Sequence, residues 1–153
     1  MKHIKMASSK FTFIARLEEK KSPQTCKWFL NLLPFTGDMI QVLWSGFACF
    51  ILLDSSSQYE GLPATDVDHT VPFENPIRIP SKGEIIMYPG NMPHLQEGGE
   101  IFMAWGPCKI TCQNGNLMGN HFLTIVEGNE NLEEFGITVL TKGAQTMCFE
   151  LIK

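Results

Sequence analysis

Short segments in which every second residue is apolar recur along most of this chain, and they constrain its fold more than any other feature. In FTFIARL, apolar residues from Phe11 to Leu17 alternate with more polar neighbours, the period of two that a half-buried β-strand requires. Strand character also appears in DMIQVLW, FACFILL, GEIIMYPG, GEIFMAWG, CKITC, HFLTIVEG and AQTMCFELI. The pattern therefore predicts about eight strands.

Two further segments have the spacing of amphipathic helices. In the first, Ser22 can cap the N-terminus, Pro23 suits the first position and Pro34 ends the helix. Its apolar stripe is Cys26, Phe29, Leu30 and Leu33. In the second, within residues 129–143, the stripe is Leu132, Phe135, Val139 and Leu140, and Gly143 suits the C-cap.

The order of these elements does not alternate strand and helix, which excludes a repeated βαβ architecture. Closing the strands into a barrel removes the exposed edges that they would otherwise leave. We therefore predict a mainly β fold, a closed β-barrel of about eight strands with two helices capping its openings. The length of 153 residues suits a single domain, residues 1–153.

Residues 54–82 interrupt the strand pattern with a long polar stretch. Four prolines fall in it, at positions 63, 72, 76 and 80, and no strand or helix period is visible. A connection of this length inside a compact domain is uncommon, and is often a lid or a binding loop, or else disordered. We expect an excursion from the barrel that covers a site.

Charge and composition exclude some classes of binding partner. The formal net charge is −4 and the twelve basic residues are scattered, so no basic stripe exists to bind nucleic acid. No segment has the length of a membrane span, and no apolar run follows the basic N-terminus, so neither a membrane protein nor a secretory signal is expected. Five cysteines without a C-x-x-C pair indicate reduced thiols and a cytoplasmic protein.

No cofactor and no metal site are predicted. Acidic residues lie beside His94, at Glu97 and Glu100, and beside His69, at Asp66 and Asp68, but neither spacing matches a compact metal motif. The chain also lacks a Walker loop, the G-x-G-x-x-G motif and a serine nucleophile elbow. These absences exclude the commonest nucleotide-binding and hydrolase classes.

The opening FTFIARLEEKKSPQTCKWFLNLLP resembles the first strand and helix of cyclophilins, and HFLTIVEGNENLEEFGITVL resembles their strand, Glu-Gly turn and second helix. Nearly the whole chain is similar to an uncharacterised bacterial and archaeal family, the domain of unknown function numbered thirty-eight thirty, which is assigned a cyclophilin-like fold. The matching positions are Ala15 to Glu19, Pro23, Thr25, Cys26, Leu33 to Phe35, Trp44, Gly46, Gly83 to Ile85, Tyr88 to Gly90, Gly119 to Phe122 and Gly143 to Gln145.

The cyclophilin resemblance implies prolyl isomerase activity, but the chain departs from that family where the chemistry would occur. Isomerisation there relies on an arginine beside a Phe-His dipeptide, which donates to the proline nitrogen as the amide loses its resonance. The corresponding segment MIQVLWSGFACFILL has no basic residue, and the only arginines are Arg16 and Arg78. His121 falls two positions later than the cyclophilin histidine, on the same strand face.

Five residues form the candidate ligand-binding site: Trp44, Tyr88, Trp105, Asn120 and His121. The aromatic residues stand at predicted strand ends, where they either fill the barrel or form an apolar pocket wall with polar handles. At the barrel rim, His121 is the candidate catalytic residue, a general base near neutral pH. The alternative is a structural histidine whose ring nitrogens are satisfied by the backbone or by Asn120.

The leading hypothesis is a protein that binds a small polar metabolite or a short peptide at the barrel mouth. Whether it is an enzyme stays open. Two enzymatic alternatives are a prolyl isomerase, which the missing arginine disfavours, and a hydrolase of small amides or rings that depends on His121. A homo-oligomeric or scaffolding role is a further alternative.

Overall fold

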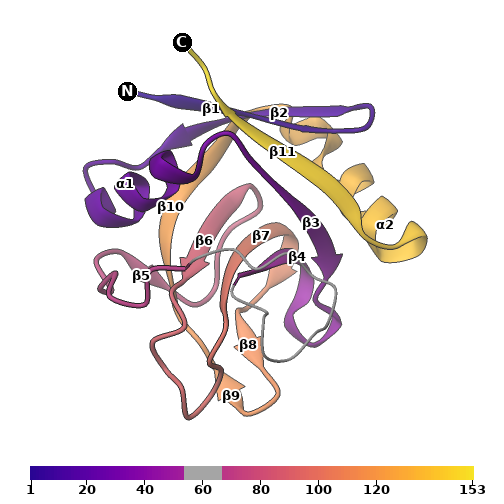
Figure 1. Cartoon of the computed structure of the whole chain (residues 1–153). Coiled ribbons are helices and arrows are strands. Elements are labelled where there is room, and N and C mark those ends of the chain that lie inside the picture. Colours follow the sequence, from indigo (N-terminus) through magenta and orange to yellow (C-terminus); the bar gives the residue numbers. More distant parts are fainter. Residues whose placement is uncertain (54–66) are drawn as a thin grey trace.

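The computed structural model describes residues 1–53 and 67–153, and its fold is mainly β (Figure 1). The N-terminal half contains β1 (His3–Ser8), β2 (Phe11–Leu17), α1 (Pro23–Leu32), β3 (Phe35–Gln41), the 3-10 turn η1 (Leu43–Ser45), β4 (Gly46–Leu53) and β5 (Pro76–Ile77). The C-terminal half contains β6 (Glu84–Tyr88), β7 (Gly99–Cys108), β8 (Thr111–Cys112), β9 (Gly115–Asn116), β10 (Gly119–Glu127), η2 (Asn129–Asn131), α2 (Leu132–Lys142) and β11 (Gln145–Leu151).

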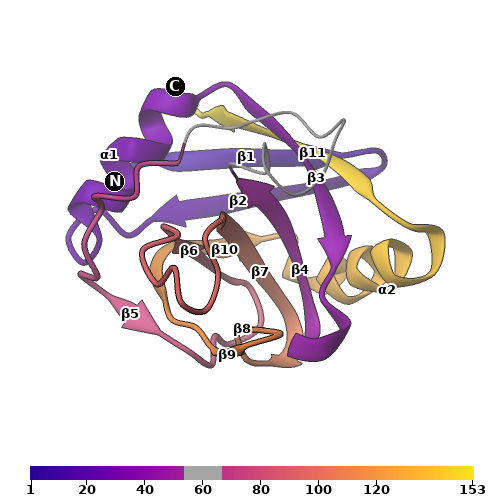
Figure 2. The same cartoon turned by 60° about the horizontal axis from the view of Figure 1, so that its bottom comes forward.

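Eight of the described strands close into an antiparallel barrel, in the order β2-β1-β11-β3-β4-β7-β6-β10, with β10 returning to β2. Figure 2 shows the ring of strands with α1 and α2 on opposite sides of it. The predicted closed barrel with two helices is confirmed. Two β-bulges interrupt β10, one beside β6 and one beside β2, where they re-aim its side chains.

The first strand, β1, was missed by the sequence analysis. Its buried Ile4, Met6 and Ser8 alternate with more exposed neighbours, so the period of two is present in HIKMAS. The charged or polar His3 and Lys5, next to Lys2, obscured that pattern. β1 pairs with both β2 and β11, and so joins the two terminal segments of the chain.

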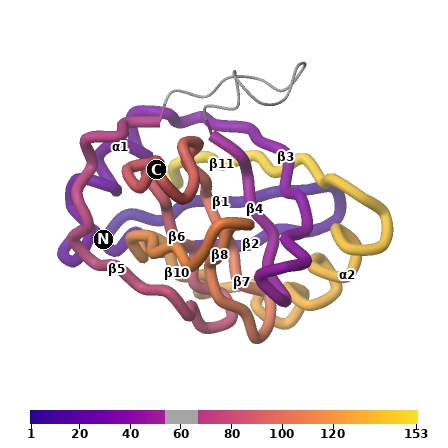
Figure 3. The backbone as a smooth tube through the Cα atoms, turned by 90° about the horizontal axis from the view of Figure 1, so that it is seen from below, coloured from indigo at the N-terminus to yellow at the C-terminus, as the bar shows by residue number. Residues whose placement is uncertain are grey.

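Each helix covers one opening of the barrel. Phe29 of α1 is fully buried, with its ring edge against Phe35, Phe122 and Phe149. Phe135 of α2 makes the same kind of contact with Phe11 and Phe13. Edge-to-face aromatic pairs of this kind stabilise a core beyond the area they bury. Figure 3, seen from below, also shows the two helices on opposite sides.

Two details of the helix predictions need correction, and a third is confirmed. Ser22 precedes α1, but its hydroxyl makes no capping hydrogen bond. Leu140 does not belong to the buried stripe of α2, because 40% of its surface is exposed. Gly143 does end α2, with a positive φ of 94° that favours glycine.

A second apolar layer lies on the outer wall of β4, β6 and β7. Its buried members are Val42, Ala48, Phe50, Ile86, Tyr88, Phe102, Ile110 and Leu117. The segment between β6 and β7 and the β8–β9 hairpin pack over this wall. Unlike a simple barrel, this one therefore has side chains buried on both faces of three strands. Of the predicted 54–82 excursion, residues 54–66 lie outside the described residues, and residues 76–77 form β5 beside β10.

Candidate functional site

The five predicted site residues lie on four different elements. Trp105, near the end of β7, lies at the barrel opening that α2 covers, and Trp44 lies in η1, which follows β3. Tyr88, Asn120 and His121 lie near the opposite opening, where β6 ends and β10 begins. Trp105 therefore lies toward the other end of β7 from Glu100, the strand partner of Tyr88.

Trp105 is a packing residue at the α2 end. It is 5% exposed, its ring lies 4.9 Å from the ring of Phe47, and its indole N–H donates to Gln41 Oε1 at 3.3 Å. A Cβ atom at Gly136 would lie 2.1 Å from the indole, so α2 needs glycine there to approach. Trp44 is instead 55% exposed, and its indole N–H donates to the Thr111 carbonyl.

Tyr88 fastens the turn between β6 and β7 to the outer wall of the barrel. Its hydroxyl donates to the carbonyl of Gln96 at 2.6 Å and accepts from the backbone N–H of Met92 at 3.1 Å. Burial raises the pKa of this phenol above its usual range. The polar end of Tyr88 is therefore used within the protein.

Glu100 lies beside Tyr88 on the neighbouring strand and is 2% exposed. One carboxyl oxygen, Oε2, accepts from Gln96 Nε2 at 3.0 Å, and the other, Oε1, has no hydrogen-bond partner among the described residues. Burial raises the pKa of this carboxyl to about 7. Its signal in the sequence was an acid inside the otherwise apolar strand GEIFMAWG.

Asn120 is fully buried and uses its whole amide. Its Nδ2 donates to Thr25 Oγ1 at 3.0 Å and to the Pro72 carbonyl at 2.8 Å. Its Oδ1 accepts from the backbone N–H groups of Glu74 and Asn75. These four bonds hold residues 72–75 against the start of α1, so Asn120 positions a loop.

The loop in turn caps the helix. The carboxylate of Glu74 accepts from the backbone N–H groups of Gln24 and Thr25, at 3.2 and 2.8 Å, where a helix N-terminus has unpaired donors. This contact replaces the expected cap by Ser22, whose hydroxyl donates to the His121 carbonyl at 2.7 Å. The sequence could not reveal this cap, because Glu74 lies 50 residues from Gln24.

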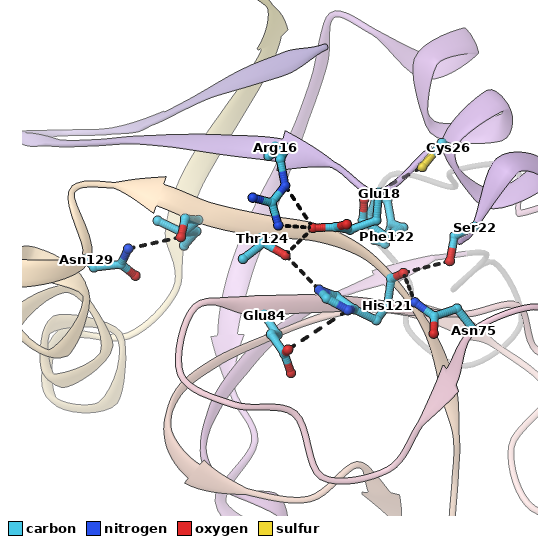
Figure 4. A network of polar contacts seen from close by, with 11 residues as sticks. Arg16, Glu18, Ser22, Cys26, Asn75, Glu84, His121, Phe122, Thr124 and Asn129 are labelled. Atoms are coloured by element: carbon cyan, nitrogen blue, oxygen red, sulfur yellow. Dashed lines mark hydrogen bonds and ion pairs between the residues drawn. The ribbon is translucent and has the colours of Figure 1, made fainter. Parts of the chain in front are cut away.

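His121 belongs to a chain of polar contacts along β10 and β2 (Figure 4). Its Nε2 lies 2.9 Å from Thr124 Oγ1, and the Thr124 hydroxyl donates to Glu18 Oε1 at 2.7 Å. The Arg16 guanidinium donates to the same Glu18 oxygen. Partial burial alone would raise the pKa of Glu18, but the hydrogen bonds from Thr124 and Arg16 outweigh it and lower that pKa.

The other ring nitrogen of His121, Nδ1, lies 4.0 Å from Glu84 Oε1. Glu84 begins β6 and pairs with Thr124, so both side chains share one wall of the sheet. In turn Thr124 pairs with Arg16 on β2. Arg16, Thr124 and Glu84 thus form a row across three strands, and His121 reaches the row through the bulge in β10.

A groove of about 510 Å³ runs along α1 at the same end of the barrel. Its lining residues are Gln24, Lys27, Trp28, Asn31 and Leu32 from the helix, and Val67, Asp68, Thr70 and Val71 from the segment that Asn120 helps to hold. The helix residues recur at the spacing of one helical face. The spacing of this face is visible in the sequence, but the sequence analysis considered only the apolar stripe on the opposite face of the helix.

The two thiols considered as nucleophiles, Cys49 and Cys108, lack the environment of reactive cysteines. Cys49 is fully buried beside Met39, and burial raises the pKa of its thiol. Burial also raises the pKa of Cys108 to about 11. Among the described residues, no group of three or more His, Cys, Asp or Glu side chains is placed to hold a metal ion. No described helix has both the length and the apolar character of a membrane span.

Comparison with known proteins gives a family and a fold. The family model described as "Protein of unknown function (DUF3830)" matches residues 4–151. No curated protein matches the chain. Among solved structures, the chain is similar to the one titled "Structure of McbB in complex with tryptophan", with a TM-score of 0.58 and 16% identity. The match covers 98% of this chain and 44% of that one, so the chain spans less than half of that protein.

Proposed function

The chain belongs to the DUF3830 family, and since the function of that family is unknown, we propose from the side chains themselves that the protein binds a small zwitterionic molecule, an amino acid or a short peptide, in the groove along α1. The observation that carries the proposal is the groove. Its volume of about 510 Å³ suits a ligand of this size.

The composition of the groove supports a ligand with two opposite charges. Lys27 of α1 and Asp68 of the facing segment offer partners for a carboxylate and an ammonium group. The side chain and then the backbone N–H of Thr70 donate to Asp68 and lower the pKa of its carboxyl, which keeps it ionised. Trp28 and Val71 supply an apolar surface for the rest of the ligand.

The similarity to McbB supports the choice of amino acids for the first screen. That protein was solved in complex with tryptophan, and the two chains are alike in fold. At 16% identity the likeness reaches no further than the fold, so the ligand class rests on the charges in the groove.

Calorimetric titration with the common amino acids and with dipeptides tests the proposal. We expect at least one to bind, and we expect Asp68→Asn and Lys27→Gln each to weaken it roughly fivefold, because each removes one exposed charge pair. Lys21→Gln is the matched control, since Lys21 precedes α1 but does not line the groove. Absence of binding at millimolar ligand would overturn the proposal.

Prolyl isomerisation receives no support from the positions of the two arginines. Arg16 is paired with Glu18 on the outer wall, and Arg78 is exposed directly after β5. A cyclophilin-like relationship and a cytoplasmic location stay predictions, as does a homo-oligomer.

A further inference from the structure

His121 and Glu84 form an acceptor pair on the neighbouring strands β10 and β6 (Figure 4). Neither residue lines the groove. His121 Nδ1 and Glu84 Oε1 are 4.0 Å apart, too far for a direct hydrogen bond. Within the described residues, Nδ1 has no hydrogen-bond partner. The contacts behind each group determine what can bind between them.

The hydrogen bonds that link His121 to Thr124 and Thr124 to Glu18 determine the tautomer of the imidazole ring. Glu18 is ionised and can only accept, so the single Thr124 hydroxyl hydrogen is donated to Glu18. The Thr124 oxygen must then accept from His121, which places the ring hydrogen on Nε2. In the neutral ring, Nδ1 consequently carries the lone pair and faces Glu84.

Glu84 is also held in place. Its Oε2 accepts from the backbone N–H of Ser81 at 2.7 Å, which leaves Oε1 facing the imidazole. Two acceptors at this separation are bridged by a group with two polar hydrogens, and a water molecule is the smallest such group. The side chains of His121 and Glu84 are 10% and 27% exposed, so a bridging water there is partly shielded from solvent.

We propose that His121 is the general base of a hydrolytic site, in which it takes a proton from a water molecule held between its Nδ1 and Glu84 Oε1. The water oxygen attacks the acyl carbon of a small ester or amide as its proton passes to Nδ1. The bond from that carbon to the leaving group then breaks. An ester releases its alkoxide, which takes the proton from His121, or its phenolate, after which His121 gives the proton to solvent. An amide nitrogen takes the proton from His121 as it leaves.

Charge placement supports this step. The imidazolium formed during attack faces Glu84 on one side, and through Thr124 it faces Glu18 on the other. A carboxylate that orients a histidine and stabilises its charged form is the arrangement used by hydrolytic triads. Here Thr124 lies between the two groups, which makes it a positioning residue.

Nitrogen-15 NMR of the unmodified protein tests the tautomer directly. At about pH 9, where imidazoles are neutral, we expect the His121 spectrum to show hydrogen on Nε2. Thr124→Ser should keep this tautomer, and Thr124→Val should lose the preference because no hydroxyl remains to accept. A spectrum with hydrogen on Nδ1 in the unmodified protein would overturn the proposal.

Hydrolysis of p-nitrophenyl acetate tests the chemistry. We expect His121→Gln and Thr124→Val to lower the rate about tenfold or more, and Thr124→Ser to restore most of it. His94→Gln, which changes an exposed histidine, is the matched control and should have the rate of the unmodified protein. Equal rates for His121→Gln and His94→Gln would refute the site, whatever the groove along α1 binds.

Discussion

The two ends of the barrel are closed by different kinds of interaction, one mainly by apolar packing and the other also by hydrogen bonds. At the α2 end, Phe135 packs on Phe11 and Phe13, and Trp105 lies directly against the backbone at Gly136. At the α1 end, Phe29 also enters the core, but the helix is attached in addition by a seam of hydrogen bonds through Asn120, Thr25 and Glu74. Both ends bury a phenylalanine from a helix, so the difference lies in how each helix is attached.

The two ends therefore differ in what they can offer to a ligand. Apolar packing has no unused hydrogen-bonding capacity, so the α2 end offers a ligand little to recognise. Polar side chains at the α1 end must each find a partner, and the loops that supply those partners also form the groove and approach His121. The fold thus places the groove and His121, on which the two proposals rest, at the end where the closure is polar.

The largest expected effect tests the apolar closure. Trp105→Ala removes a nearly buried indole between Phe47 and Gly136 and should lower the free energy of unfolding by about 3–5 kcal/mol. Trp44→Ala, at a tryptophan that is 55% exposed, should cost about 1 kcal/mol or less. Urea unfolding of the two variants measures the difference. Equal losses would mean that both tryptophans are structural, or that neither is.

The second prediction concerns Glu100, which lies where β7 begins, near the α1 end. Burial raises its pKa from 4.5 to about 7, so the folded protein binds this proton more tightly than the unfolded chain does. Stability should therefore fall as pH rises from 4.5 to 7, by about 3 kcal/mol in total, and then stay level.

Unfolding measured from pH 5 to pH 8 checks this sign. Glu100→Gln should remove most of the decline and should be more stable than the unmodified protein at pH 8. Glu97→Gln, at an exposed position in the same segment, should leave the decline unchanged. A stability difference between Glu100→Gln and the unmodified protein that does not vary with pH would show that Glu100 is ionised throughout.

The smallest expected effect tests the polar closure. Asn120→Ala leaves the N–H groups of Glu74 and Asn75 without their acceptor, and should lower the free energy of unfolding by about 2 kcal/mol. Hydrogen exchange at those two amides should accelerate, because the loop opens locally. Asn114→Ala, at an exposed asparagine whose side chain donates to the Leu95 carbonyl, should change neither measurement much. Unchanged hydrogen exchange in Asn120→Ala would show that Asn120 does not hold this loop in place.

Much of the architecture was predictable because alternation and helical spacing are local properties. The period of two located β2 and β10, and the stripe around Phe135 located α2. The missed strand β1 shows the limit of that method, since polar residues at a chain end hide a period that only pairing with β2 and β11 makes plain. Leu140 shows a second limit, because a helical stripe has edges that neighbouring elements define.

The candidate site was less predictable, because residue type does not reveal a partner. Trp44 and Trp105 look alike in sequence, yet one is exposed and the other buried. Nothing local in the chain indicates that Glu74 caps α1, or that the Thr124 hydroxyl links His121 to Glu18. These contacts join positions as many as 106 residues apart.

The sequence by itself determined which segments become strands and helices, and therefore that the strands must close on themselves to bury their apolar faces. Only the tertiary structure decided which polar side chains meet. The physical reason is range: hydrophobic periodicity acts over neighbouring residues, whereas a hydrogen bond depends on atoms within about 3 Å that the folded chain alone brings together.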